Sequence, residues 1–363
     1  MQLNLIAKFN TNNILNKMKK NKIVSLLTAA AMTTSLTNVA HSQTTFSGYI
    51  EATLMNADHE NVVNIPAAKS LGSESLFRID SKGKLSNGMD YSLFQEFESD
   101  ESFAFHQRQI AINPAKDITL FYSFDSVKGS ELARTLTPYA TERHTDVTGQ
   151  TGVPELIDIT SGENFIGFDI NNVGPAGQLS VAYNPNMDTT SNTGSDRLLP
   201  LTNSQSGYSV GYKVTPVDGL TVGAGLTKID SKDTTKQDVT AKSLGFTFAK
   251  APFAIGAQRI QQEGLKTTQV ATQKDQADII SATYAVSKEI TLGLGYLQNE
   301  RTLVGVKSTV DTESRLVALA YNLGPVVTSL NYEQSYDTPA SGTVAPTSGR
   351  DITITKIKVK ANF

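Results

Sequence analysis

Charged side chains stand at every second position near the end of the chain. Lys356, Lys358 and Lys360 alternate with apolar residues, and successive side chains of a β-strand point to opposite faces. The three lysines therefore share one face of a predicted strand that ends at Phe363. A row of this kind attracts and orients charged solutes through its electric field. It does not pair a nucleophile with a neighbouring base, as covalent catalysis would require.

A second charged region is the stretch of residues 125–162, which is 38 residues long and has no strand pattern. Its acidic residues are Asp125, Glu131, Glu142, Asp146, Glu155 and Asp158. They outnumber the basic residues Lys128, Arg134 and Arg143. A loop of this length inside a compact domain usually has a function of its own or is disordered.

Enzyme chemistry has little support in the sequence. The chain has no cysteine, and only His59, His106 and His144 follow residue 42. No HExxH or GxxxxGK motif occurs, so neither a zinc hydrolase nor a phosphate-binding loop is indicated. A Ser/His hydrolase within a barrel is the alternative, but a single histidine beside Arg108 is more often a lining residue. We expect no enzyme activity, no cofactor and no bound metal.

The first 42 residues have the composition of a secretory leader. They contain five lysines and no acidic residue, an apolar run at 23–32 and small residues before Gln43, which is the layout of a cleaved signal peptide. We predict a signal peptide at 18–42 and a gene-model extension at 1–17. Beyond the leader, 27 basic and 35 acidic residues give a net charge of about −8. This charge argues against a nucleic-acid partner.

Two-faced segments of about ten residues recur from residue 45 to the C-terminus. Seven short turns join them in pairs, at 86–88, 114–116, 172–176, 216–219, 250–252, 287–288 and 323–325. Longer polar connections lie between the pairs, at 57–73, 187–205, 231–239, 264–274, 301–311 and 337–349. The turns carry the Gly, Pro, Asn and Ser residues that hairpins need. One further strand at each end, at 45–56 and 350–363, brings the count to sixteen.

This pattern predicts an all-β fold, a 16-stranded antiparallel transmembrane β-barrel. In its last strand Ile352 and Ile354 fall on the lysine face, which predicts either a bulge near Thr355 or a strand end above the membrane. The alternative is a secreted all-β protein such as a sandwich, an adhesin or a solenoid. Sandwiches do not need a strict alternation of short and long connections, so the barrel is favoured.

Several segments resemble the Gram-negative general porins, which are trimeric, along nearly all of the chain after residue 42. The segments are 76–85 (LFRIDSKGKL) and 89–98, joined by a Ser-Asn-Gly turn, then 105–111 (FHQRQIA), 117–124, 163–172 and 178–184. They resemble the second to seventh strands of that family. The order and spacing of the segments carry the resemblance, because no single motif is a sharp signature.

The resemblance implies a channel of the Gram-negative outer membrane for passive diffusion of small hydrophilic solutes and ions. It places residues 125–162 as an inward-folded third loop, a constriction whose acidic residues face the basic wall residues Arg78, Lys82 and Arg108. It also implies that Phe363 is the signal read by the barrel assembly machinery. The implied partners are the lipid bilayer, lipopolysaccharide and further copies of the chain in a homotrimer.

Three features depart from the porin pattern. The acidic loop motif is reduced to residues 152–156, and the first strand has Glu51 where the family often has a lysine. The second external loop, at 99–102, is too short to latch over a neighbouring subunit. Two alternatives stay open: a substrate-selective channel, for example for an anion or a sugar, and a non-conducting or adhesive surface barrel.

Overall fold

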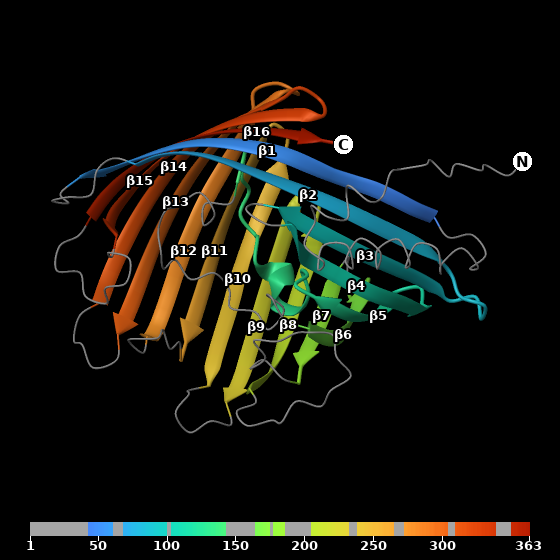
Figure 1. Ribbon diagram of the computed structural model, residues 1–363. Helices are drawn as coiled ribbons and strands as arrows, with labels where there is room; N and C mark the ends of the chain where they lie inside the picture. The colour runs from blue at the N-terminus through green and yellow to red at the C-terminus, as the bar shows by residue number, and fades with distance from the viewer. Residues whose placement is uncertain are drawn as a thin grey trace, which may run out of the picture.

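Sixteen antiparallel strands in the described part of the chain close into one barrel (Figure 1). The computed structural model describes residues 43–60, 68–99, 103–142, 164–174, 177–185, 205–231, 238–264, 272–303, 309–338 and 350–363. Each strand pairs with its neighbours in sequence, and the first strand pairs with the last. The predicted 16-stranded antiparallel barrel is therefore confirmed. The predicted extension at 1–17 and signal peptide at 18–42 lie outside the described residues.

The wall varies in height around the barrel. The strands are β1 (Gln43–Glu60), β2 (Ala68–Lys84), β3 (Asp90–Ser99), β4 (Phe103–Ala115), β5 (Ile118–Phe124), β6 (Asn164–Asn171), β7 (Gln178–Asn184), β8 (Gln205–Val217), β9 (Leu220–Ser231), β10 (Val239–Lys250), β11 (Phe253–Glu263), β12 (Thr272–Ala285), β13 (Ile290–Leu303), β14 (Thr309–Asn322), β15 (Val326–Thr338) and β16 (Arg350–Asn362). A short 3-10 helix, η2 (Gly129–Ala133), follows β5. Because β5 and β7 have 7 residues each and β1 has 18, the wall is lowest around β5 to β7.

The seven short turns lie where the sequence predicts them. In three of them Gly88, Gly219 and Gly324 have φ values of 86°, 79° and 82°, a conformation that glycine adopts without steric cost. The strand ends are less predictable. Because backbone pairing of β1 with β2 continues past Asn56 to the pair of Ala57 with Ala68, the predicted connection at 57–73 is too long at both ends.

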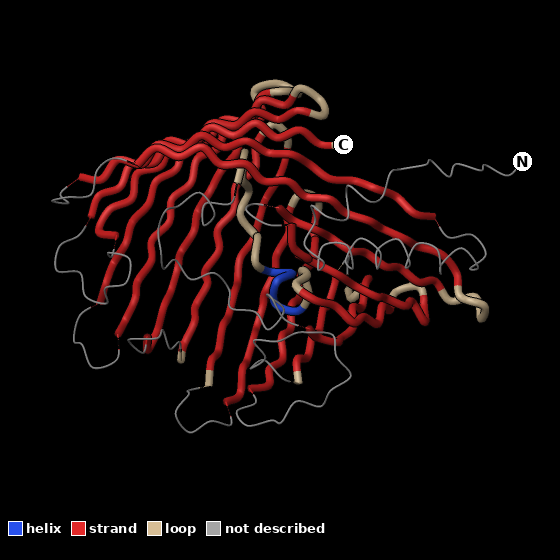
Figure 2. The backbone as a smooth tube through the Cα atoms, viewed as in Figure 1, coloured by secondary structure: helices blue, strands red, loops and turns tan. Residues whose placement is uncertain are grey.

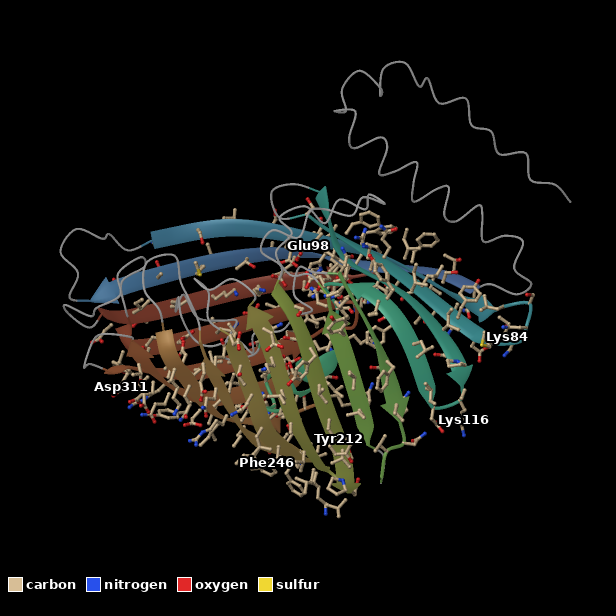
Figure 3. All side chains as sticks on the ribbon, turned by 90° about the horizontal axis from the view of Figure 1, so that it is seen from below. Lys84, Glu98, Lys116, Tyr212, Phe246 and Asp311 are labelled. Carbon is tan, nitrogen blue, oxygen red and sulfur yellow. The ribbon has the colours of Figure 1, made fainter. Side chains whose placement is uncertain are left out.

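The outward face of the wall is apolar. Its exposed aliphatic and Phe side chains include Ile50, Leu54, Leu244, Phe246, Leu294 and Ile357. The exposed tyrosines on this face are Tyr122, Tyr284, Tyr296, Tyr321 and Tyr332. In Figure 3, Tyr212 and Phe246 lie on the outer side of the wall. An apolar outer face with tyrosines is typical of a barrel that stands in lipid.

The last strand closes the barrel against the first. The register between β16 and β1 is continuous from the pair of Asn362 with Tyr49 upward. Phe363 extends this seam, because its N–H donates to the carbonyl of Gly48 at 3.0 Å and the Gly48 N–H donates back at 3.2 Å. The predicted pairing of the terminal segments is confirmed.

Ile352 and Ile354 stay on the lysine face of β16. The register passes through Thr355, opposite Asn56, without a shift, so the predicted bulge at this point is wrong. Both isoleucine side chains are buried with Ala57 in a small apolar cluster. A strand end above the membrane stays a prediction.

Phe363→Ser separates two roles of the terminal residue. Its side chain is 65 % exposed, and the backbone bonds to Gly48 do not need the ring, so we expect unfolding of the refolded barrel to change by only about 0.5 kcal/mol. Assembly in cells should fall severalfold if the residue is the assembly signal. The measurement compares thermal unfolding in detergent with the amount of folded barrel in the outer membrane. Equal yield in cells would contradict the signal role.

Candidate functional site

Residues 126–142, named the inner strap here, run along the inward face of the barrel wall. The strap begins on β7 to β9. The Gly129 N–H donates to Ser180 Oγ at 2.8 Å, and the Ser130 N–H donates to Ser209 Oγ at 2.6 Å. The Ser130 hydroxyl shares a hydrogen bond of 2.6 Å with Thr227. Figure 2 shows the helix and the loop after it inside the ring of strands.

The second half of the strap continues across β10 to β15. The Ala133 carbonyl accepts hydrogen bonds from Ser243 and Gln258, both at 2.8 Å. Further along, Ser281 donates to the Pro138 carbonyl, and Thr141 donates to Asn331. The strap is thus fastened to successive strands by side chains that sequence reasoning did not single out, because Ser, Thr and Gln on a strand face are common.

Small residues on the inner wall let the strap lie close to it. A Cβ atom placed on any of these glycines would stand under 3 Å from a strap atom: Gly211, Gly223, Gly225, Gly256 and Gly293. The closest approach is at Gly211, where the added Cβ would be 2.0 Å from the Gly129 carbonyl oxygen. Glycine in a strand often marks a close approach of another backbone, and these glycines form a groove for the strap.

The strap is the first part of the predicted inward-folded loop at 125–162. Residues 143–163 lie outside the described residues, and with them the predicted acidic residues Asp146, Glu155 and Asp158. Inward folding of the whole loop and a role for these three carboxylates therefore stay predictions.

The described acidic residues of the loop are not a free acidic row. Glu131 is buried and lies 3.2 Å from Arg134 within the strap. Glu142 forms ion pairs with Lys356, at 2.8 Å, and with Lys358. Asp125 stands at the end of β5 with φ of 47°, where the chain leaves the wall.

The lysines of the last strand face inward, as their spacing predicts, but two of them are enclosed. The side chains of Lys356 and Lys358 are 14 % and 16 % exposed. Lys358 lies between Glu142 and Glu51, and the Lys360 ammonium lies 3.3 Å from the ring centroid of Tyr49. Much of their charge is therefore compensated by neighbouring carboxylates rather than presented to water.

Arg78 lies on the inner wall, as the resemblance implies. Its guanidinium forms two hydrogen bonds of 2.8 Å with Asp80 and lies 3.6 Å from Glu96. It also stacks over the ring of Phe94, with the guanidinium carbon 4.2 Å from the centroid. Lys82 shares this face by strand alternation and is exposed. Arg78 is thus paired with Asp80 on its own strand.

Arg108 lies on the outward face of the wall. The inward position expected from the resemblance is therefore wrong. Arg108 is on the same face of β4 as the exposed Ile110, and its guanidinium donates to Asn164 at 3.2 Å. The register of β3 with β4 shifts between Gln95 and Phe97, which adds one residue to β4. A bulge reverses the alternation of side chains, and that moves Arg108 outward.

His106 takes the inward position beside this bulge, among three carboxylates. Its Nδ1 lies 2.7 Å from Glu96, and its Nε2 lies 3.5 Å from Glu98 and 3.9 Å from Asp125. Sequence reasoning treated His106 as a lining residue and missed both glutamates. Glu96 and Glu98 follow Phe94 at every second position and so share its strand face. This alternation was the signal in the sequence that could have identified them.

The described ranges hold no gathering of three ligating side chains that would suit a metal ion. They also contain no helix that is long and apolar enough to cross a membrane.

A closed barrel with an apolar outer face and a polar, charged inner face has the layout of a channel. The sequence profile of the Gram-negative porins matches residues 27–338. The chain belongs to this family. No curated protein matches this porin in sequence.

Solved structures share the fold of this porin at low sequence identity. The anion-selective porin from Comamonas acidovorans has a TM-score of 0.63 at 14% identity, covering 89% of this chain and all of that one. The outer membrane channel DcaP of Acinetobacter baumannii has a TM-score of 0.64 at 10% identity, covering 89% and 97%. The trimer form of OmpT, an outer membrane protein of Vibrio cholerae, has 0.57 at 12%, covering 89% and 100%. Family and fold thus point to a channel rather than an enzyme.

Proposed function

We propose that this porin is a passive diffusion channel of the outer membrane for small hydrophilic solutes and ions. The observation that carries the proposal is the closed 16-stranded wall, apolar outside and polar inside. A barrel of this strand number is wide enough to leave an aqueous lumen. Diffusion through it needs no energy coupling, and no catalytic group is required.

The loop at 125–162 acts as the constriction in this proposal. Its support is the course of the inner strap, which occupies the inward face from β7 to the seam and is held there by hydrogen bonds and the ion pairs of Glu142. A loop that occupies part of the lumen reduces the cross-section, and selectivity then follows the remaining diameter and its charges. Arg78 and Lys82 lie on the inner wall that faces this loop, whereas Arg108 points outward and does not line the constriction.

Planar-bilayer recording tests the channel function. The purified protein should insert and give stable, ohmic conductance steps that grow in proportion to salt concentration. Block of this current by one solute at low, saturating concentration would favour the substrate-selective channel. A folded, inserted protein without any conductance would contradict the proposal and favour the closed or adhesive surface barrel.

We also infer that the porin assembles as a homotrimer, surrounded by lipid bilayer and lipopolysaccharide and inserted by the barrel assembly machinery through Phe363. Support for the trimer comes from the family and from the trimer form of OmpT, one of the structural relatives. Mass measurement of the detergent-solubilised protein by light scattering, with the detergent subtracted, tests it. A mass of one chain at all concentrations would contradict the trimer.

A further inference from the structure

The inner wall has two parts that differ in their access to water. From β5 to β16, inward-facing side chains of the described residues are mostly buried. Examples with exposure of 2 % or less are Ser123, Ser209, Ala241, Leu297, Ser314 and Ile354. In an unobstructed aqueous lumen such side chains would be wet. A solute therefore has little contact with this part of the wall.

The inward face of β2 to β4 is different. Arg78, Asp80, Glu98 and His106 keep side-chain exposures of 33 %, 38 %, 32 % and 32 %, and Asp125, beside His106, keeps 27 %. We name these five residues, together with Glu96 at their centre, the open strip. Apart from Lys84 and Asp90, which pair beside the turn between β2 and β3, the ion-paired groups of the inward face that are most exposed to water lie in the open strip.

Acidic groups dominate the open strip. Four carboxylates, those of Asp80, Glu96, Glu98 and Asp125, stand beside one guanidinium and one imidazole. The Arg78 guanidinium is already shared between Asp80 and Glu96. Its positive charge compensates part of the strip, and Lys82, exposed on the same face of β2, adds one further basic group, so four carboxylates stand beside two basic side chains and His106.

Several basic groups elsewhere on the inner side are held in ion pairs, whereas Lys82 is exposed on the inner face of β2 and Lys360 lies over the ring of Tyr49. Lys128 pairs with Asp169, whose side chain is 6 % exposed, and Arg134 pairs with Glu131. Lys356 and Lys358 pair with Glu142, and Lys358 also with Glu51. The lysine row is thus compensated where it is closest to the strap, and it does not set the sign of the potential over the open strip.

We propose that the solute path follows the open strip and that its carboxylates make this porin selective for cations and cationic solutes. The proposal rests on the proposed channel function and names its substrate class. A low-dielectric wall with one sign of charge raises the local concentration of the opposite ion. The expected preference differs from that of the anion-selective structural relative, whose fold alone is shared.

Reversal potentials in a salt gradient test the selectivity. The unmodified porin should pass K⁺ in preference to Cl⁻, and Glu98→Gln with Asp125→Asn should lower the permeability ratio by about threefold for each charge removed. That factor combines the opposite effects of one unit charge at about 14 Å in water on K⁺ and on Cl⁻. The matched control is Asp278→Asn with Glu313→Gln, which removes the same charge from exposed outward pairs and should leave the ratio unchanged.

Thiol chemistry locates the path independently, because the chain has no cysteine of its own. Glu98→Cys should react with a small cationic methanethiosulfonate faster than with an anionic one. Attachment of the anionic reagent should restore the lost charge and the K⁺ preference, whereas attachment of the cationic reagent should reverse the preference. Ser314→Cys, on the buried inner face of β14, should react far more slowly. These variants need only small substitutions, so they remain informative if the double variant fails to fold.

The outcomes separate the inference from the function it rests on. A conducting porin that prefers Cl⁻, an unchanged ratio in Glu98→Gln with Asp125→Asn, or equal labelling of the two cysteines would overturn the cation path and leave the channel function intact. Absence of conductance in a folded, inserted protein would overturn the channel function itself.

Discussion

Glu142→Gln is expected to lower the unfolding free energy of the barrel by about 2–4 kcal/mol. The carboxylate is the partner of both Lys356 and Lys358, and the substitution leaves two enclosed ammonium groups, of which only Lys358 keeps an ion pair, with Glu51. Removing one member of a fully buried pair costs about 3–5 kcal/mol, and the residual exposure of 14–17 % on these side chains lowers that figure. Denaturant unfolding of the refolded protein in detergent measures the change.

The same substitution should also move the permeability ratio toward anions, because uncompensated lysine charge then reaches the lumen. The control is Glu142→Gln combined with Lys358→Gln, which removes the unpaired charge and should recover part of the lost stability. A double-mutant cycle gives the coupling between the two residues. Additive effects of the two substitutions would contradict the ion pair that anchors the end of the strap to the seam.

Gly211→Ala is expected to lift the first turn of the strap from the wall. The new Cβ would stand 2.0 Å from the Gly129 carbonyl oxygen, and both sides of that contact are backbone, so no side chain can turn away. Overpacking of this kind costs about 1–3 kcal/mol. Loss of the hydrogen bonds from Gly129 and Ser130 to Ser180 and Ser209 adds about 1 kcal/mol each if they break.

The displacement can be read from the reactivity of Ser130→Cys, at a position that is fully buried when the strap is in place. This cysteine should react with a small thiol reagent much faster in the Gly211→Ala background than alone. Gly72→Ala is the control, because a Cβ there has no neighbour within 4 Å. Unchanged thermal unfolding and an unreactive cysteine in the Gly211→Ala protein would contradict a strap that lies against Gly211.

The face that a charged residue occupies was predictable wherever the strand is regular. Lys356, Lys358 and Arg78 follow strict alternation, and all three face inward as predicted. Arg108 does not, because the shift between Gln95 and Phe97 inserts one residue into β4 and reverses the alternation. Bulges depend on how two strands pair and twist, and the sequence of one strand does not reveal them.

Charge pairing was less predictable than charge position. The sequence indicates an acidic loop and a basic last strand, yet it does not indicate that Glu142 lies against Lys356, 214 residues away. This contact exists because the strap follows the groove of small residues on the inner wall until it reaches the seam. Its course depends on the shape of several strands together.

The sequence by itself determined the barrel, its strand number and the apolar outward face, because side-chain alternation and turn chemistry are local properties of the backbone. It also carried the family resemblance. Only the tertiary structure decided which charges meet and which remain in water. Those properties arise from closure of the wall and from the path of the strap across it, where residues far apart in the chain compete for the same space and the same counter-charge.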